Sequence, residues 1–262
     1  MQLELLESHP SNAAHVTPIL FVHGSWHAAW CWENFLPYFA EHGYHAYALS
    51  LRGHGKSEGR EKIRWLSATR DYVADVDQVV QALGAPPVLV GHSTGGYVVQ
   101  KYLEKHHLPA GVLLASVPVS GILGFGVRHS LRHPWAFIKS HLLLDPWHLV
   151  ATPTLAQDAF FSATLPVEAA ARHFARLQTE SLRIEAEMLF LALPRPGRVK
   201  TPLLVLAAAD DRIYSAAEAR ATARAYRTQA EIFAGMAHDM MLEPGWQKVA
   251  DRILNWLEAR KL

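Results

Sequence analysis

A serine lies between glycines in the stretch VLVGHSTGGYVVQ, which runs from residue 88 to residue 100. The residues Gly91 to Gly95 fit the pattern G-x-S-x-G, and an apolar run precedes them. Between a strand and a helix, this pattern forms a sharp turn that exposes the serine hydroxyl in a strained backbone conformation. The sequence therefore predicts that Ser93 is a nucleophile. The alternative is a turn of small residues without any chemistry.

A nucleophilic serine needs a base that takes its proton and a carboxylate that orients the base. Two later apolar runs are followed by such residues: Asp210 and Asp211 come after residues 203–207, and His238 comes after residues 230–233. This chain order, with the acid before the histidine, favours a Ser-His-Asp triad. The spacing alone leaves Asp210 and Asp211 as alternatives, while Asp239 is expected to point away from its neighbour His238.

The intermediate of acyl transfer carries an oxyanion, which requires fixed N–H donors. One expected donor is the backbone N–H of Thr94, directly after the serine. The other is the backbone N–H of Ser25, in the loop HGSW that follows the first apolar strand. The aromatic and neighbouring residues that are candidates for the substrate pocket are Trp26, His92, Phe125, Trp135 and Trp147.

No metal or cofactor is expected, although the chain has 16 histidines. None of them pairs with another at a spacing typical of a metal site beside a carboxylate. The single cysteine, Cys31, cannot form an internal disulfide, and its tryptophan neighbours favour a buried structural residue over a catalytic thiol.

The elements that must position these residues alternate along the chain. Apolar runs predict strands at 18–22, 44–49, 88–90, 111–115, 203–207 and 230–233, and helical spacing predicts helices at 30–41, 69–83, 94–106, 215–227 and 245–260. Such alternation indicates an α/β fold with a mostly parallel sheet and helices on both faces. Ligands of these sheets bind beyond the carboxyl ends of the strands, where the motifs above are expected.

The alternation breaks between residues 117 and 200, which is too long for a loop without structure. Helical stretches near 166–179 and 180–193 predict a helical insertion that forms a cap over the strand ends. The expected division is therefore a core at 1–116, a cap at 117–200 and the rest of the core at 201–262. The alternative is a helical decoration remote from the site.

Composition narrows the class of partner. The chain has 262 residues, half of them hydrophobic, and its 25 basic and 24 acidic side chains give a net charge of +1. A near-neutral surface does not attract nucleic acid or an anionic membrane. No apolar run approaches the roughly 18 residues of a membrane span, and the N-terminus lacks the features of a signal peptide. A cytoplasmic protein is expected, with the choice between monomer and homodimer open.

Together the motifs resemble the α/β-hydrolase fold family over nearly the whole chain. The matching stretches are HGSW at 23–26, LRGHGKS at 51–57, GHSTGG at 91–96, DRI at 211–213 and HDMMLE at 238–243. The family places its acid at the aspartate before arginine, which implies Asp211 rather than Asp210. Many members have an aspartate where this chain has Ser50. Members with an aspartate nucleophile, such as haloalkane dehalogenases and epoxide hydrolases, are disfavoured by Ser93.

The resemblance implies a serine-dependent hydrolase, a carboxylesterase that forms an acyl-enzyme without a cofactor. A small-to-medium neutral ester with a largely apolar acyl or aromatic group is expected as the small-molecule substrate. Arg128 and Arg132 are the residues that could clamp an anionic group instead. The alternatives are a lactone or carbon–carbon bond hydrolase, a cofactor-free oxygenase on the same triad, and a non-catalytic ligand receptor.

Overall fold

The centre of the molecule is a seven-stranded sheet with the strand order β1-β3-β2-β4-β5-β6-β7. The computed structural model describes residues 1–63 and 68–262. Every neighbouring pair of strands is parallel except β1 with β3. The mostly parallel sheet expected from the sequence is thus confirmed. The strands are β1 (Leu5–Ser8), β2 (Ile19–Val22), β3 (Ala46–Leu49), β4 (Val88–His92), β5 (Gly111–Leu114), β6 (Leu203–Ala208) and β7 (Ala230–Phe233).

Strand β1 has no counterpart in the elements that the sequence predicted. It pairs antiparallel with β3, with Leu5 opposite Leu49. As an edge strand it is only partly buried. A short edge strand lacks the continuous apolar run that marks a strand buried on both faces. The sequence signal was therefore weak.

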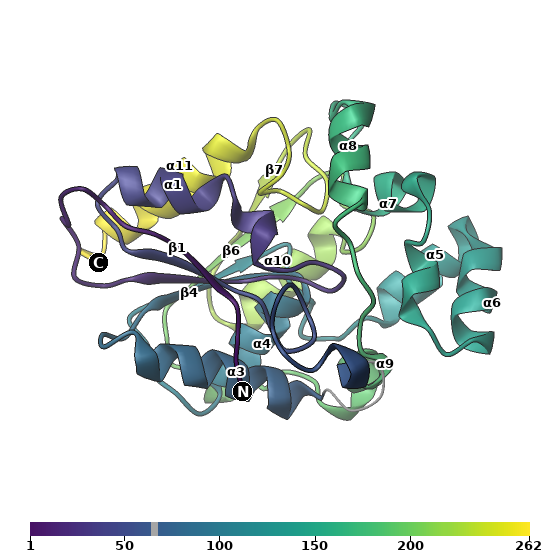
Figure 1. The fold of residues 1–262 in the computed structure, drawn as a ribbon, viewed down its shortest axis with the longest axis horizontal. Helices are drawn as coiled ribbons and strands as arrows, with labels where there is room; N and C mark the ends of the chain where they lie inside the picture. Colours follow the sequence, from purple (N-terminus) through teal and green to yellow (C-terminus); the bar gives the residue numbers. More distant parts are fainter. Residues whose placement is uncertain (64–67) are drawn as a thin grey trace.

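Helices cover both faces of the sheet. Helices α1 and α11 lie on one face, and α3 and α4 lie on the other (Figure 1). Strands β2, β4, β5 and β6 are buried along their whole length between these layers. The helices of the core are η1 (Ala29–Trp32), α1 (Phe35–Glu41), η2 (Arg60–Lys62), α3 (Thr69–Ala82), α4 (Thr94–Leu103), α10 (Ala216–Ala225) and α11 (Trp246–Glu258).

The helix expected at residues 30–41 is wrong in its extent, because the structure divides it into η1 and α1. Pro37 is the third residue of α1. Proline lacks an N–H donor and is tolerated in the first turn of a helix, so α1 begins just before it.

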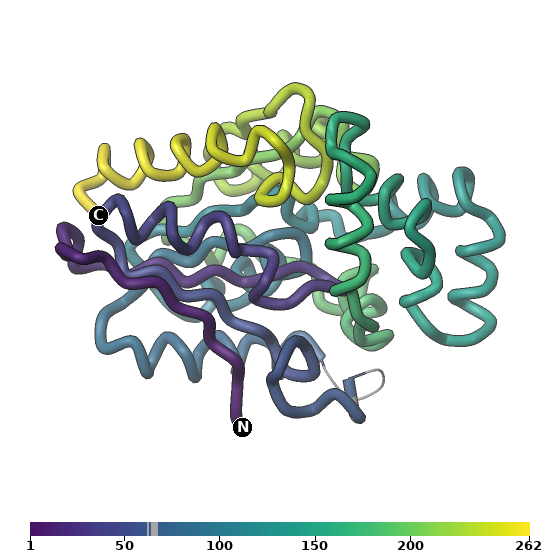
Figure 2. Tube along the Cα trace, turned by 45° about the horizontal axis from the view of Figure 1, so that its top comes forward, coloured from purple at the N-terminus to yellow at the C-terminus, as the bar shows by residue number. Residues whose placement is uncertain are grey.

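Between β5 and β6 the described chain forms helices and no strand, which agrees with the expected helical insertion. Its helices gather at the end of the molecule away from the C-terminus, in both views of the chain (Figures 1 and 2). They are α5 (Leu123–Arg132), α6 (Pro134–Leu142), η3 (Pro146–Leu149), α7 (Pro153–Phe160), α8 (Val167–Phe174), α9 (Leu182–Ala186), η4 (Glu187–Leu191) and η5 (Pro196–Arg198).

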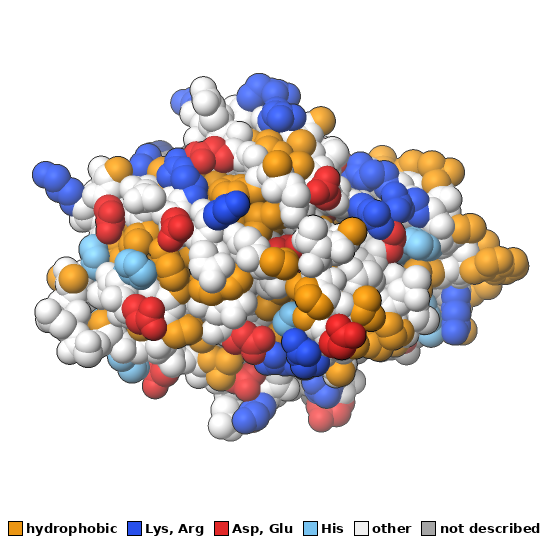
Figure 3. Space-filling model, turned by 90° about the horizontal axis from the view of Figure 1, so that it is seen from above, with side chains coloured by type: hydrophobic (Ala, Val, Ile, Leu, Met, Phe, Trp, Pro, Cys, Tyr) orange, Lys and Arg blue, Asp and Glu red, His pale blue; other side chains and the backbone are white. Residues whose placement is uncertain are grey.

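The outer faces of α5 and α6 carry large apolar side chains that the described residues leave exposed. Trp135 is 81% exposed, and Leu131 and Leu142 are nearly as open. Hydrophobic side chains accordingly gather at this end of the surface in Figure 3. Within the described ranges, no helix combines the length and the apolarity that a membrane crossing demands.

The turn from β4 into α4 forces Ser93 into an unusual backbone conformation, with φ of 50° and ψ of −117°. The turn also brings α4 very close to strand β2. A Cβ atom on Gly95 would lie 2.2 Å from the carbonyl oxygen of Val22. A Cβ atom on Gly91 would lie 2.5 Å from the carbonyl oxygen of Gly95. Both glycines are therefore required by backbone packing, as the motif predicted.

We expect Gly95→Ala to lower the free energy of unfolding by about 3 kcal/mol, because the new Cβ atom meets backbone that cannot yield. The matched control is Gly126→Ala in α5, where a Cβ atom would meet nothing within 4 Å. Alanine there should stabilise the protein by up to about 1 kcal/mol through helix propensity. Urea denaturation of both variants measures the difference. Equal stability of the two variants would contradict the proposed steric constraint.

Candidate active site

A buried histidine and carboxylate form a direct hydrogen bond at the carboxyl end of the sheet. His238 Nδ1 donates to Asp211 Oδ2 over 2.8 Å, and both side chains are 1% exposed. Asp211 Oδ1 accepts the backbone N–H groups of Ile213 at 2.7 Å and Tyr214 at 2.9 Å. These bonds fix the carboxylate and leave His238 Nε2 free to act as a base. Asp210 is exposed to solvent instead.

Ser93 faces a very small cavity of about 20 Å³, which has room for roughly one water molecule. The hydroxyl of Tyr214 interacts with the hydroxyl of Ser93 there. In the described part of the chain, no hydrogen bond joins Ser93 to His238. The cavity is lined by Ser25, Trp26, Ser93, Thr94, Ile122, Phe125, Glu185, Met188, Ile213 and Tyr214.

The two expected oxyanion donors lie side by side at this cavity. The hydroxyl oxygens of Ser25 and Thr94 are 2.7 Å apart. Thr94 is the first residue of α4, and the first N–H groups of a helix have no partner inside it. A Cβ atom on Gly24 would lie 2.8 Å from Ser93 Cβ, so the loop can approach the serine only because residue 24 is glycine.

His23 holds this loop from behind as a neutral imidazole. Its Nδ1 donates to the carbonyl of Gly24 over 2.8 Å, and its Nε2 accepts the N–H of Leu51 over 3.0 Å. Burial lowers the pKa of His23 well below its usual value, and the nearby His54 lowers it further. The neutral tautomer that both hydrogen bonds require is therefore stable at neutral pH.

A second buried histidine–carboxylate pair lies behind the first. Asp239 Oδ2 accepts from His27 Nε2 over 2.9 Å, with both side chains buried. His27 Nδ1 donates to the carbonyl of Ser25 over 2.8 Å, which ties the pair to the oxyanion loop. Burial alone would lower the pKa of His27, but the charge and hydrogen bond of Asp239 outweigh it and raise that pKa. Asp239 indeed points away from the triad histidine, toward His27.

His92, next to Ser93 in the chain, is also neutral. Burial, together with the charge of His238, lowers the pKa of His92 to about 3. Its Nε2 donates to the backbone carbonyl of His238 over 3.0 Å. This bond connects the loop of the histidine to the strand that carries the serine.

The side chains in the described regions that could hold a metal ion are His92, His238 and Asp239, whose ligand atoms lie within 4.8 Å of one another. Each of the three side chains has one polar atom with a hydrogen-bond partner, while His92 Nδ1 and Asp239 Oδ1 have none among the described residues. His238 Nδ1 donates to Asp211, His92 Nε2 donates to a carbonyl, and Asp239 Oδ2 accepts from His27. All three side chains are thus part of the hydrogen-bonded network around His238.

The pocket candidates from the sequence lie in different surroundings. Trp26 and Phe125 line the cavity at Ser93, whereas His92 is buried in the network behind it. Trp147 packs inside the insertion against Phe174. Trp135 lies on the outer surface of α6 and lines neither of the cavities described here.

Neither Tyr214 nor Glu185 was among the site residues predicted from the sequence. Tyr214 lies three positions after Asp211, so its placement beside Ser93 depends on how the loop after β6 turns. Glu185 comes from the insertion, which the sequence left without a residue-level interpretation. Only the docking of α9 brings its side chain to the cavity at Ser93.

A larger and mainly apolar cavity of about 390 Å³ lies inside the insertion. It shares three wall residues, Ile122, Phe125 and Glu185, with the small cavity at Ser93. The shared wall places an apolar volume directly beside the nucleophile. The remaining lining residues are Leu123, Gly126, Val127, Ser130, Phe137, His141, Leu149, Leu182, Ala186 and Leu189.

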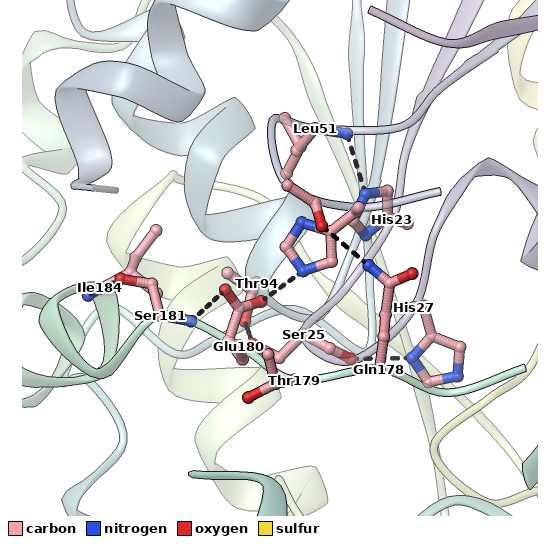
Figure 4. A network of polar contacts seen from close by, with 12 residues as sticks. His23, Ser25, His27, Leu51, Thr94, Gln178, Thr179, Glu180, Ser181 and Ile184 are labelled. Atoms are coloured by element: carbon pink, nitrogen blue, oxygen red, sulfur yellow. Dashed lines mark hydrogen bonds and ion pairs between the residues drawn. The ribbon is translucent and has the colours of Figure 1, made fainter. Parts of the chain in front are cut away.

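A segment between α8 and α9 attaches the insertion to the core beside the site. The N–H of Gln178 donates to the carbonyl of Trp26 over 2.9 Å. Glu180 is buried and accepts from the hydroxyl of Tyr72 over 2.6 Å. Figure 4 shows Gln178 and Glu180 beside the loop that carries Ser25. The insertion is therefore fixed to the loop that carries Ser25.

Comparisons with known proteins match this arrangement to one family. The model of the alpha/beta hydrolase family matches residues 19–252. A non-heme chloroperoxidase from Streptomyces lividans is 36% identical over 107 residues, which are 38% of this chain and 37% of that protein. A bifunctional esterase/perhydrolase from Acinetobacter calcoaceticus is 34% identical over 107 residues, again 38% and 37% of the two chains. The matches thus span less than two fifths of these relatives.

A solved structure shows the likeness over the whole length. A thermophilic esterase from Thermogutta terrifontis superposes with a TM-score of 0.76 at 18% identity. The superposition covers 99% of this chain and 95% of the esterase. At this level of identity the likeness shows the fold alone.

We expect His27→Gln to destabilise the protein by about 3–5 kcal/mol near pH 6, because it leaves Asp239 buried without its partner. The folded-state pKa of His27 is raised above 6.5, so the ionic stabilisation is complete below pH 6.5 and is lost as pH rises through the raised pKa. The difference in unfolding free energy between wild type and variant should therefore shrink toward about pH 9.

Urea denaturation at several pH values measures this difference. The control is His9→Gln, an exposed histidine whose removal should change the stability by less than about 0.5 kcal/mol at every pH. A His27→Gln deficit that stays constant or grows from pH 6 to pH 9 would show that the pair contributes no ionic stabilisation.

Proposed function

Because the chain belongs to the alpha/beta hydrolase family, we propose that it is a serine hydrolase that cleaves carboxylic esters. Ser93 is the nucleophile, His238 the base and Asp211 the residue that orients the base. The observation that supports this most is the buried 2.8 Å hydrogen bond from His238 to Asp211 beside the strained turn of Ser93. Such a turn and such a pair together are typical of acyl transfer.

The proposed reaction has two steps. Ser93 Oγ attacks the ester carbonyl carbon while His238 Nε2 takes the hydroxyl proton, and Asp211 stabilises the resulting imidazolium. The oxyanion of the tetrahedral intermediate accepts from the N–H groups of Ser25 and Thr94. The intermediate collapses when His238 protonates the leaving alcohol. A water molecule, activated by the same histidine, then hydrolyses the acyl-enzyme and restores the serine.

The apolar cavity supports a small-to-medium ester with a largely apolar acyl or aromatic group. At about 390 Å³ it lies in the range of small-molecule pockets. We assign residues 117–200 as the cap that forms this pocket. The small volume left at Ser93 implies that the cap or Tyr214 moves when substrate enters.

A fluorophosphonate probe should label wild-type protein at Ser93 and should leave Ser93→Ala unlabelled, because only an activated serine hydroxyl attacks the phosphorus. The ester activity of the variant should fall by about 10³-fold or more. Mass spectrometry of the labelled peptide and a chain-length series of nitrophenyl esters provide the measurements.

Adding substrates of the alternative reactions to the ester series separates the alternatives. Rapid hydrolysis of lactones or of a carbon–carbon bond, or rapid oxygenation, together with slow ester hydrolysis would assign a different reaction to the same triad. Tight ligand binding without turnover would identify a receptor. Folded wild-type protein that resists the probe would refute the nucleophile.

We expect Asp211→Asn to lower kcat for esters by about 10⁴-fold, because the amide stabilises the wrong tautomer of His238. The matched control is the neighbouring Asp210→Asn, which removes a carboxylate that is exposed to solvent. It should keep kcat within about twofold of wild type. Steady-state kinetics on one nitrophenyl ester compares the two. An equal loss in both variants would remove Asp211 from its assigned role.

A further inference from the structure

Glu185 has a carboxyl group whose surroundings the proposed reaction does not explain. It lies on α9 and lines both the small cavity at Ser93 and the apolar cavity of the insertion. Glu185 is only partly buried, and its carboxyl oxygens are not among the fully buried atoms that lack a partner, so the carboxyl group is accessible at the cavities that the residue lines. No hydrogen bond or ion pair from the described residues reaches this carboxyl group. A carboxyl group that lines two cavities without a partner on the protein is available to a polar group of a ligand.

The electrostatic surroundings of Glu185 favour a cation over an anion. Burial, together with the charges of Glu180 and Asp145, raises the pKa of Glu185 to about 8. No lysine or arginine lines either cavity in the described part of the chain. The two arginines that the sequence offered as an anion clamp are paired: Arg128 with Glu218, and Arg132 with Asp158.

We propose that Glu185 binds a positively charged amine of the substrate, whose apolar part occupies the cavity of the insertion. This assignment rests on the proposed esterase function and narrows its substrate class to amine-bearing apolar esters. It departs from the neutral ester that the sequence favoured. The supporting observation is the unpartnered carboxyl group in the wall that the two cavities share.

An ammonium group supplies what the site lacks. Its N–H donors satisfy the carboxyl oxygens, and its charge stabilises the ionised form of Glu185 in a region of low dielectric constant. A neutral chain in the same place leaves the carboxyl group without a partner. A carboxylate in the same place is repelled by Glu185 and by the negative charges of Glu180 and Asp145.

The test uses three methyl esters of equal chain length that differ in the terminal group. Methyl 6-aminohexanoate ends in an ammonium, methyl heptanoate in a methyl group and monomethyl pimelate in a carboxylate. We expect wild-type kcat/KM to be about tenfold higher for the ammonium ester than for the heptanoate near pH 9, and lowest for the pimelate. The preference for the ammonium ester should grow from pH 7 to pH 9 as Glu185 ionises.

Glu185→Gln keeps the shape of the side chain and removes its charge. It should abolish both the preference and its pH dependence, so the measured quantity is the ratio of kcat/KM for the ammonium ester to that for methyl heptanoate within each variant. The matched control is Glu168→Gln, an exposed glutamate on α8 of the same insertion, which should retain the wild-type preference. A wild type without preference, or a Glu185→Gln variant that keeps it, would overturn the assignment.

Binding separates this proposal from the esterase function on which it rests. Calorimetry with methyl 6-aminohexanoate and Ser93→Ala should show binding that is lost when Glu185→Gln is added. Binding without hydrolysis of any ester by wild type would refute the esterase and keep the amine site. Hydrolysis of methyl heptanoate without any advantage for the ammonium ester would refute the amine site alone. Neither binding nor hydrolysis would refute both.

Discussion

The contact between the first turn of α4 and strand β2 is the constraint on which the site depends. Gly95 sits so close to the carbonyl of Val22 that no side chain fits between them. This contact fixes the position of the helix, and the chain can enter the helix only through the strained conformation of Ser93. The strain is offset by the buried strands on both sides of β4, which leave the turn no room to relax. Ser93, the proposed nucleophile, is therefore positioned by backbone packing rather than by its own side chain.

The histidines around Ser93 divide into a neutral group and a charged pair. His23 and His92 stay neutral because burial penalises their charged forms, and each holds a backbone carbonyl near the serine. His27 carries charge more readily because Asp239 is its buried partner. The result is a dry, preorganised layer beneath the reacting atoms. Electrostatic effects are larger in such a layer than in water, since few solvent dipoles screen them.

The insertion provides the other wall of the cavity at Ser93. Phe125 and Glu185 reach the cavity at Ser93 from helices α5 and α9 of the insertion. The segment at Gln178 and Glu180 anchors these helices to the core loops. The apolar cavity and the carboxyl group of Glu185 thus lie beside Ser93, at the wall that the two cavities share. In the proposed reaction, the core supplies Ser93, Asp211 and His238, and the insertion supplies the pocket for the substrate.

The sequence by itself determined the sheet, the helical insertion and the turn at Ser93, because apolar runs and glycine positions report local burial and backbone geometry. It also placed Asp211 and His238 after the correct strands, although a family resemblance was needed to choose between Asp210 and Asp211. The edge strand β1 and the division of the predicted helix before Pro37 were not predicted from the sequence, since their patterns are short. Only the tertiary structure decided that Asp239 pairs with His27, that Tyr214 contacts Ser93, and that Glu185 lies unpartnered beside them. These residues are far apart in the chain, and their contacts arise from packing of whole elements, for which a single sequence carries no local signal.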